Sequence, residues 1–211
     1  MADALYILAL FAVQLFLIVD PLAIVPVFLT LTKSNSRKER IRIARVSVVV
    51  ASVVLLVFSF FGSWLLAHFG ISINAVKIGG GLLLLIIGFE MVYGKYTGSE
   101  LTEKEQHLAT RMDDISITPL AIPLMSGPGA ITTVILFSGS AGSASGYLIM
   151  ILGIILVGIA SYLIISNSDR IKKALGDIGT KVVVWVMGIL IVFLATQYII
   201  DGLSAVLGGV I

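Results

Sequence analysis

Long apolar runs separated by short polar stretches make up almost the whole chain. Residues 4–31 form the first run, residues 46–67 the second and residues 76–93 the third. As one helix rising 1.5 Å per residue, the 28 residues of the first run would be roughly 42 Å long, whereas the hydrocarbon core of a bilayer is about 30 Å thick. We therefore expect the first run to tilt strongly or to break.

The second half of the chain repeats this pattern. Residues 115–168 carry no charge and hold a fourth apolar run, a Gly/Ser-rich turn at 138–146 and a fifth run over 147–165. A polar stretch over 169–181 precedes the sixth run, 182–200. The pattern predicts an all-α integral membrane protein with six transmembrane segments.

Lysine and arginine are distributed unevenly between the loops, and cytoplasmic loops are usually enriched in them. The loops after the first, third and fifth segments hold all but one of the 14 basic residues. These are Lys33, Arg37, Lys38, Arg40, Arg42, Arg45, Lys95, Lys104, Arg111, Arg170, Lys172, Lys173 and Lys181. Only Lys77 falls on the other side. We expect a multi-pass protein of the cell membrane, with these loops inside and both termini outside.

Two short stretches rich in proline and glycine interrupt the first and fourth runs. They are residues 19–26 (Val-Asp-Pro-Leu-Ala-Ile-Val-Pro) and residues 124–133 (Leu-Met-Ser-Gly-Pro-Gly-Ala-Ile-Thr-Thr). Proline removes a backbone donor, and glycine costs roughly 1 kcal/mol relative to alanine inside a helix, so segments one and four should break near mid-membrane. Irregular backbone at that depth is tolerated only where it is buried in protein or lines a wet cavity. We expect the two breaks to form the walls of one site.

Each break has the pattern of a helix start. Asp20 followed by Pro21 pairs a capping acceptor with proline at the first helical position, and Ser126 or Gly127 can cap the second half-helix. Gly129 leaves the next amides unshielded, so a ligand carboxylate or another small anion can bind there. The candidate substrate-binding residues are Asp20, Pro21, Ala23, Ser126, Gly127, Pro128, Gly129, Ala130, Ile131, Thr132 and Thr133.

Asp20 is the carboxylate nearest the membrane centre, and two roles for it stay open. As a cap it would accept the amide of Ala23 or Ile24. As a coupling residue it would pair with a substrate ammonium group or carry a proton. Glu90, near the cytoplasmic end of the third segment, is a second candidate for coupling, and its alternative is an ordinary interfacial residue.

The chain also resembles itself at one constant offset, which places residue 21 on residue 128. Pro-x-Ala-Ile at residues 21–24 falls on residues 128–131, and Gly-x-Leu at residues 81–83 falls on residues 188–190. Because three segments per repeat is an odd number, the second repeat would lie upside down relative to the first, as in many secondary transporters.

These features predict one transmembrane domain over residues 1–211. Its first repeat is expected over about residues 4–94 and its second over about residues 115–201. A cytoplasmic linker over about residues 95–114 would join them.

The composition limits which partners and which kinds of site we expect. Hydrophobic residues make up 58% of the chain and charged residues 12%, whereas soluble domains have about 45–50% apolar residues. The net charge of +2, without a basic run interleaved with aromatics, predicts no nucleic-acid partner. Zero cysteines exclude thiolate sites, and His68 and His107 are far apart in sequence. We therefore expect neither a metal nor a cofactor.

Both breaks and the third segment resemble the MarC family. The residues that carry the resemblance are 20–28 (Asp-Pro-Leu-Ala-Ile-Val-Pro-Val-Phe), Gly79-Gly80-Gly81, 119–124 (Pro-Leu-Ala-Ile-Pro-Leu) and 126–133 (Ser-Gly-Pro-Gly-Ala-Ile-Thr-Thr). The resemblance covers essentially the whole chain and implies a six-span transporter of small neutral amino acids of the glycine, alanine and serine type. It also implies symport with protons. Whether sodium serves instead of protons, whether the protein forms a homo-oligomer, and whether it imports or exports its substrate stay open.

Three functional classes can be compared on these features. A secondary carrier in the lipid bilayer accounts for the inverted repeat, the paired breaks and the sparse buried charge. A channel for small solutes would also use broken helices, but the sequence has no charged ring or repeated carbonyl-filter motif. An intramembrane enzyme would need a catalytic constellation, and one central carboxylate does not supply it. The sequence predicts a carrier rather than an enzyme, with an exporter of amino acids or other small metabolites as the alternative.

Overall fold

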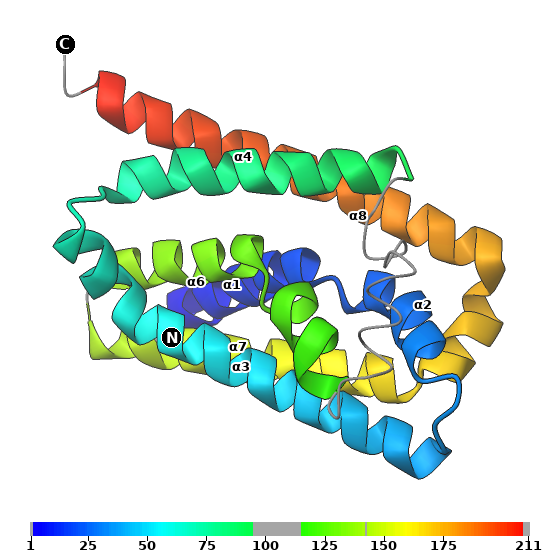
Figure 1. The fold of residues 1–211 in the computed structure, drawn as a ribbon. Coiled ribbons are helices and arrows are strands. Elements are labelled where there is room, and N and C mark those ends of the chain that lie inside the picture. The colour runs from blue at the N-terminus through cyan, green and yellow to red at the C-terminus, as the bar shows by residue number, and fades with distance from the viewer. Residues whose placement is uncertain (1, 95–114, 142, 209–211) are drawn as a thin grey trace.

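The computed structural model describes residues 2–94, 115–141 and 143–208, and every secondary-structure element in these ranges is a helix (Figure 1). The helices are α1 (Ala2–Val19), α2 (Pro21–Leu31), α3 (Arg37–His68), α4 (Ile73–Val92), η1 (Ser116–Met125), α6 (Pro128–Ala141), α7 (Ala144–Ser166) and α8 (Ser168–Leu207). The predicted all-α architecture is confirmed. The predicted linker over residues 95–114 lies outside the described residues.

Five helical stretches in the described ranges are long and apolar enough to cross a membrane. In one of them, residues 3–31, α1 and α2 together form the stretch. The pair η1 and α6 is bent by 58° and makes a sixth span if the bent pair is counted as one. An integral, multi-pass protein is therefore confirmed, and the predicted number of six depends on this pair.

Two long helices begin earlier than the apolar runs predict. α3 begins at Arg37 because Ser36 and Glu39 form a capping box, in which the Ser36 amide donates to Glu39 Oε2 over 2.7 Å and the Glu39 amide donates to Ser36 Oγ over 3.4 Å. α8 begins at Ser168 and leaves helical geometry only at Gly176, where φ is 64°. The expected polar loops before segments two and six are thus largely helical, because polarity marks the edge of the bilayer rather than the end of a helix.

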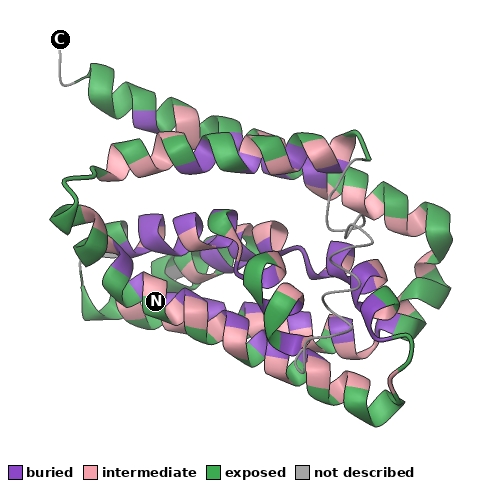
Figure 2. Ribbon diagram, viewed as in Figure 1, coloured by how far each residue is buried: buried purple, intermediate pink, exposed green. Residues whose placement is uncertain are grey.

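The buried side chains form two separate apolar clusters. The larger cluster takes residues from α1, α2, α3, η1, α6 and α7, among them Phe11, Leu15, Phe28, Leu120 and Met150. The smaller cluster consists of Leu84, Met91, Ile191 and Ala195, all from α4 and α8. Figure 1 shows α4 and α8 side by side along one edge of the molecule, and Figure 2 shows the buried positions gathered where helices face one another.

Glycines bring α4 and α8 close together. A Cβ atom at Gly81 would lie 2.8 Å from the carbonyl oxygen of Ala195, and one at Gly88 would lie 3.0 Å from the carbonyl oxygen of Gly188. A Cβ atom at Gly188 would in turn lie 3.1 Å from the carbonyl oxygen of Gly88. Small residues allow such backbone contact between membrane helices. The two helices run antiparallel, and we call them the α4–α8 pair.

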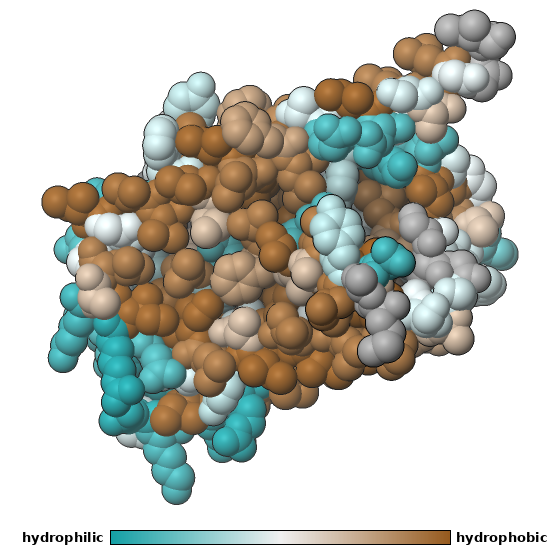
Figure 3. Space-filling model, turned by 180° about the vertical axis from the view of Figure 1, so that it is seen from behind, coloured by the Kyte–Doolittle hydropathy of each residue, from teal (hydrophilic) through white to brown (hydrophobic). Residues whose placement is uncertain are grey.

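Large apolar side chains cover the outside of the molecule. Phe61, Trp64, Phe193 and Leu163 are all more than half exposed. Figure 3 shows that apolar residues occupy most of one face and that hydrophilic residues gather near its margins. A surface of this kind is expected where a protein faces lipid rather than water.

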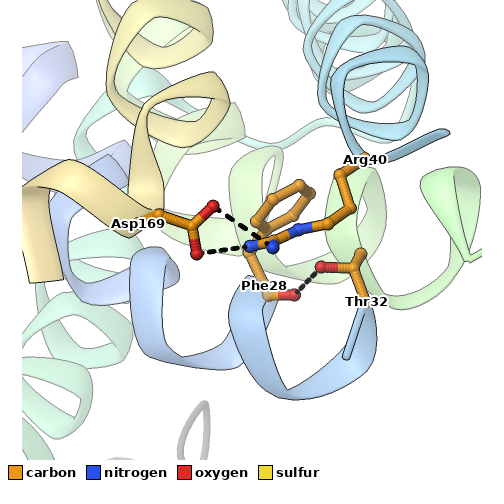
Figure 4. Close-up of polar contacts among 4 residues, drawn as sticks. All are labelled: Phe28, Thr32, Arg40 and Asp169. Atoms are coloured by element: carbon orange, nitrogen blue, oxygen red, sulfur yellow. Dashed lines mark hydrogen bonds and ion pairs between the residues drawn. The ribbon is translucent and has the colours of Figure 1, made fainter. Parts of the chain in front are cut away.

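Arg40 joins the ends of three helices (Figure 4). Its guanidinium contacts Asp169 at the start of α8 through two N–O distances of 3.2 Å, and its carbon atom Cζ lies 5.8 Å from the centre of the Phe28 ring of α2. Thr32 ends α2 by donating its hydroxyl hydrogen to the Phe28 carbonyl over 2.7 Å. Arg40 therefore ties the beginning of α3 to α2 and α8.

Replacing Arg40 by alanine is expected to destabilise the protein by about 1 kcal/mol, because exposed ion pairs contribute about 0–1 kcal/mol and cation–π contacts about 0.5–1 kcal/mol. Thermal unfolding in detergent would measure the change. Arg45→Ala is the matched control, since Arg45 is exposed on the same helix and forms no ion pair with a described residue. Equal transition temperatures for both variants would contradict the structural role of Arg40.

The expected orientation can be tested because the chain has no cysteine. Ser34 lies exposed between α2 and α3, and Ser145 lies exposed at the start of α7. In intact cells, Ser34→Cys should be protected from a membrane-impermeant maleimide and Ser145→Cys should react, because the basic loops are expected inside. Reaction of both variants from the same side would contradict the orientation.

Candidate functional site

Asp20 stands between α1 and α2 in an unusual backbone conformation. Its φ of 39° and ψ of 66° lie in the left-handed region, and its own amide donates to the carbonyl of Phe16 over 2.9 Å. Pro21 follows at the first position of α2, and Asp20 Oδ1 accepts the amide of Ala23 over 3.1 Å. Asp20 therefore caps α2 with one carboxylate oxygen.

The second carboxylate oxygen of Asp20 is buried without a partner. The residue is 3% exposed, and Oδ2 accepts no hydrogen bond from any described group. The two ion pairs among the described residues, Arg40 with Asp169 and Lys172 with Asp177, do not involve Asp20. Burying an unpartnered carboxylate oxygen is costly, so a proton or an ammonium group brought to Oδ2 would be stabilised there.

The junction between η1 and α6 is built differently. The amide and the hydroxyl of Ser126 both donate to the carbonyl of Ala121, over 3.0 Å and 2.9 Å. The Ser126 side chain is therefore bonded within η1 and does not cap α6. Of the two expected caps, Gly127 is the one in place, since its carbonyl accepts the amide of Ile131 over 3.0 Å.

The first turn of α6 lies against α1 and α4. A Cβ atom at Gly129 would lie 2.5 Å from Leu84 Cδ2 and 3.2 Å from Ile18 Cγ2. The next residue, Ala130, is 2% exposed. Because Ile18 is two residues from Asp20, this packing brings the start of α6 next to the end of α1. The two junctions, which are far apart in sequence, therefore lie near each other.

Thr132 and Thr133 lie where α6 packs against the α4–α8 pair. A Cβ atom at Gly80 of α4 would overlap the Thr132 methyl carbon, so Gly80 permits this contact. Thr133 donates its hydroxyl hydrogen to the Gly129 carbonyl over 2.9 Å and also interacts with the Tyr198 hydroxyl of α8. Both threonines are buried.

A cavity of about 780 Å³ lies beside α2. It is lined by α2, the end of α4 and the first half of α8, and the lining residues include Ala23, Val25, Pro26, Met91, Thr180, Val184 and Trp185. Lys172, Asp177 and Lys181 are the charged residues of its lining. Since the Ala23 amide is bonded to Asp20, the cavity connects the basic end of the molecule with the first turn of α2.

Glu90 lies away from the two junctions. It is half-buried on α4, close to the end of that helix. Its neighbours Met91 and Val92 line the cavity, but Glu90 does not. Of the two carboxylates considered for coupling, Asp20 is therefore the one at a junction.

Sequence reasoning did not identify the partners of α6 in this site. Ile18, Leu84 and Tyr198 are ordinary apolar or aromatic residues in regular helices, and nothing in their local sequence marks them. Gly80 did have a signal, because it belongs to a run of three glycines in the third segment.

Comparison with known proteins shows relatives along the whole chain. Residues 5–207 match the family model described as MarC family integral membrane protein. A UPF0056 membrane protein of Methanocaldococcus jannaschii is 36% identical over 205 residues, which are 97% of this chain and 99% of the relative. Another of Pyrococcus abyssi is 35% identical over 208 residues, 99% of this chain and all of the relative. One of Buchnera aphidicola is 34% identical over 201 residues, 95% and 94% of the two chains. No solved structure matches the chain.

Proposed function

Because the chain belongs to the MarC family of integral membrane proteins, we propose that it is a secondary carrier of small neutral amino acids such as glycine, alanine and serine, coupled to protons. The observation that supports this most is the buried Asp20 carboxylate, whose Oδ2 atom has no hydrogen-bond partner in the part of the chain that the structure describes. A carboxylate in this position can receive an ammonium group or a proton. Both are needed by a carrier that moves a zwitterion with a proton gradient.

The start of α6 supplies the complementary half of the site. The first amides of a helix have no acceptor within the helix, and the helix dipole favours an anion beside them. In α6 these amides include those of Gly129 and Ala130, and packing against Ile18 brings them next to the end of α1. We place the substrate carboxylate at these amides and the substrate ammonium group at Asp20 Oδ2.

Close packing around Gly129 favours a small substrate. Leu84 and Ile18 leave no room for a Cβ atom at this position, and Ala130 is buried. A ligand held at the first turn of α6 would meet these side chains. Glycine, alanine and serine should therefore bind better than leucine or phenylalanine.

An inverted repeat is part of the proposal, and the α4–α8 pair supports it. At the offset that places residue 21 on residue 128, Gly81 corresponds to Gly188 and Gly88 corresponds to Ala195. Exchanging the two repeats converts the contact of Gly81 with Ala195 into a contact of Gly188 with Gly88, and both contacts exist. A pseudo-two-fold axis between the two helices would produce this relation.

The two junctions lie at residues that the same offset relates. The amide of Ile24 donates to the carbonyl of Asp20 over 3.3 Å, and the amide of Ile131 donates to the carbonyl of Gly127 over 3.0 Å. This is the ordinary first backbone bond of an α-helix, and in α2 and α6 it falls at residues related by the offset. The side chains differ, since the first junction has a carboxylate where the second has a glycine. This difference suits a substrate with a cationic end and an anionic end.

Uptake into proteoliposomes tests the proposal. With an acidic outside, labelled glycine should accumulate inside, a protonophore should abolish the accumulation, and unlabelled alanine or serine should compete better than leucine. Accumulation driven only by a sodium gradient would contradict proton coupling. Stronger competition by leucine and phenylalanine would contradict the small site. Net transport outward under the same gradient would favour an exporter.

A further inference from the structure

We infer that the cavity beside α2 binds an anionic phospholipid. The cavity has a volume of about 780 Å³ and lies between α2, the end of α4 and the first half of α8. Lys172 and Lys181 of α8 hold the phosphate group of the lipid, and the apolar wall of the cavity covers the beginning of its acyl chains. The inference goes beyond the proposed carrier and does not depend on its substrate.

A change of direction in α8 brings the two lysines to the same cavity. Lys172 and Lys181 are nine residues apart in sequence, and a straight helix with about 3.6 residues per turn would place them on opposite faces. Both nevertheless line the cavity. The helix bends at Gly176, where φ is 64° and ψ is −176°, a combination that is essentially restricted to glycine (Figure 1). Gly176 therefore permits the arrangement of the two lysines.

The charged part of the lining attracts an anion. Lys181 is exposed and forms no ion pair with a described residue. Lys172 lies 3.9 Å from Asp177, and both side chains are more than half exposed, so this ion pair contributes little stability. Two lysines and one aspartate thus give this part of the cavity an excess of positive charge.

The cavity wall changes from charged to apolar along α8. Asp177, Lys181 and Val184 follow one another at intervals of four and three residues, which places them on one face of the helix. From Asp177 to Trp185 this wall extends over roughly 12 Å at 1.5 Å per residue. The lining residues from α2 and from the end of α4 include Val25, Pro26, Met91 and Val92. An amphiphile can cover both parts of this wall, whereas a free anion would leave the apolar part uncovered.

Aromatic side chains border the cavity where lipid headgroups are expected. Trp185 is 49% exposed, and Tyr93, which directly follows α4, is 74% exposed. Tryptophan and tyrosine are enriched at the boundary between a membrane and water. Val182, which also lines the cavity, is 53% exposed, as expected of an apolar residue beside lipid. Basic pockets between transmembrane helices bind the headgroups of anionic lipids.

Titration of the purified full chain with lipid in detergent tests the inference. Phosphatidylglycerol is the anionic probe and phosphatidylcholine the zwitterionic one, and native mass spectrometry counts the lipid molecules that stay bound. We expect a single phosphatidylglycerol to be retained and to raise the unfolding temperature, because a ligand of the folded protein stabilises it. Phosphatidylcholine should be lost under the same conditions. Equal retention of the two lipids would overturn the inference.

The two lysines are tested against a matched control. Lys172→Gln with Lys181→Gln should weaken phosphatidylglycerol binding by at least about tenfold, because both lysines attract the anionic headgroup. Lys38→Gln with Lys173→Gln removes the same charge from two exposed lysines that do not line the cavity, and its binding should equal that of the unmodified protein. All four lysines are exposed, so both double variants should fold. Equal losses in both would indicate general attraction to basic residues and would overturn a specific site.

Two single substitutions should change the affinity in opposite directions. Asp177→Asn removes the carboxylate beside Lys172, so phosphatidylglycerol should bind more tightly. Gly176→Ala leaves the charge unchanged, and its Cβ atom would meet no other atom within 4 Å, but alanine disfavours the backbone conformation of this position. Phosphatidylglycerol should therefore bind more weakly to this variant. Weaker binding to Asp177→Asn, or unchanged binding to Gly176→Ala, would contradict the assigned geometry.

Soluble competitors distinguish a lipid from a free phosphate. Dihexanoyl phosphatidylglycerol carries a phosphate and short acyl chains, whereas glycerol phosphate carries the phosphate alone. The short-chain lipid should displace bound phosphatidylglycerol, and glycerol phosphate at the same concentration should not. Equal displacement by both would show a site for free phosphate and would overturn the lipid assignment. These measurements involve no transport, so a failure of the lipid site and a failure of the proposed carrier are distinguishable.

Discussion

Asp20→Asn should still fold and exchange glycine, with weaker affinity, but it should no longer accumulate glycine in response to a pH gradient. Asparagine keeps the oxygen that accepts the Ala23 amide and tolerates the left-handed backbone of this position, where φ is 39°. It removes the charge at Oδ2, a buried atom without a hydrogen-bond partner among the described residues. Counterflow and gradient-driven uptake, measured on the same preparation, separate the two functions.

Asp20→Ala is the control that removes the cap as well as the charge. Losing an N-cap costs about 1 kcal/mol, and a left-handed alanine costs a further 1–2 kcal/mol, so this variant should unfold at a lower temperature than Asp20→Asn. If Asp20→Asn shows the gradient-driven uptake of the unmodified protein, Asp20 is a structural cap and has no part in coupling.

Gly129→Val should abolish glycine binding. A Cβ atom at this position meets Leu84 at 2.5 Å and Ile18 at 3.2 Å, and the two methyl groups of valine would cover the amides at the start of α6. Glycine binding to the purified protein, measured by calorimetry, should fall below detection. A loss of affinity of about tenfold already corresponds to about 1.4 kcal/mol, so partial loss is measurable as well.

Two further variants separate lost binding from lost packing. Gly139→Ala lies on the same helix, and its Cβ atom would meet only Ile73, with Cδ1 at 3.1 Å, so binding should be close to normal. Gly129→Val combined with Leu84→Ala removes the main collision and should recover thermal stability without recovering binding. Recovery of both properties would remove the substrate carboxylate from this turn.

Local sequence was enough to predict where the two half-helices begin. Asp20 with Pro21 and Gly127 with Pro128 mark helix starts by their chemistry alone, and α2 and α6 begin at these prolines. α3 and α8 begin before the apolar runs that predict them, because each helix continues through polar residues at its start. The capping box of Ser36 and Glu39 was visible in the sequence and was the better signal for α3.

The segment before the second junction shows a missed local signal. Thr118 and Ile122 have extended backbone within η1, with φ of −128° at both, and each precedes a proline. Proline disfavours helical geometry in the residue before it. Reading residues 119–123 in this way predicts irregular backbone there rather than one regular segment.

The neighbours of the site could not be predicted from local sequence. Leu84 reaches Gly129, and Gly80 receives Thr132, only because α4 and α6 pack antiparallel although they are distant in sequence. Ser126 could equally have turned to α6, and its bond to Ala121 depends on how η1 ends. Tertiary packing determines these contacts, and the hydrophobic periodicity of a single helix does not predict them.

Counterflow of glycine in proteoliposomes tests the central claim most directly. Vesicles are loaded with excess unlabelled glycine and diluted into a trace of labelled glycine. A carrier predicts transient uptake of label above its outside concentration, saturable and suppressed by alanine. Fast, non-saturating entry that never exceeds the outside concentration would contradict a carrier and would indicate a channel.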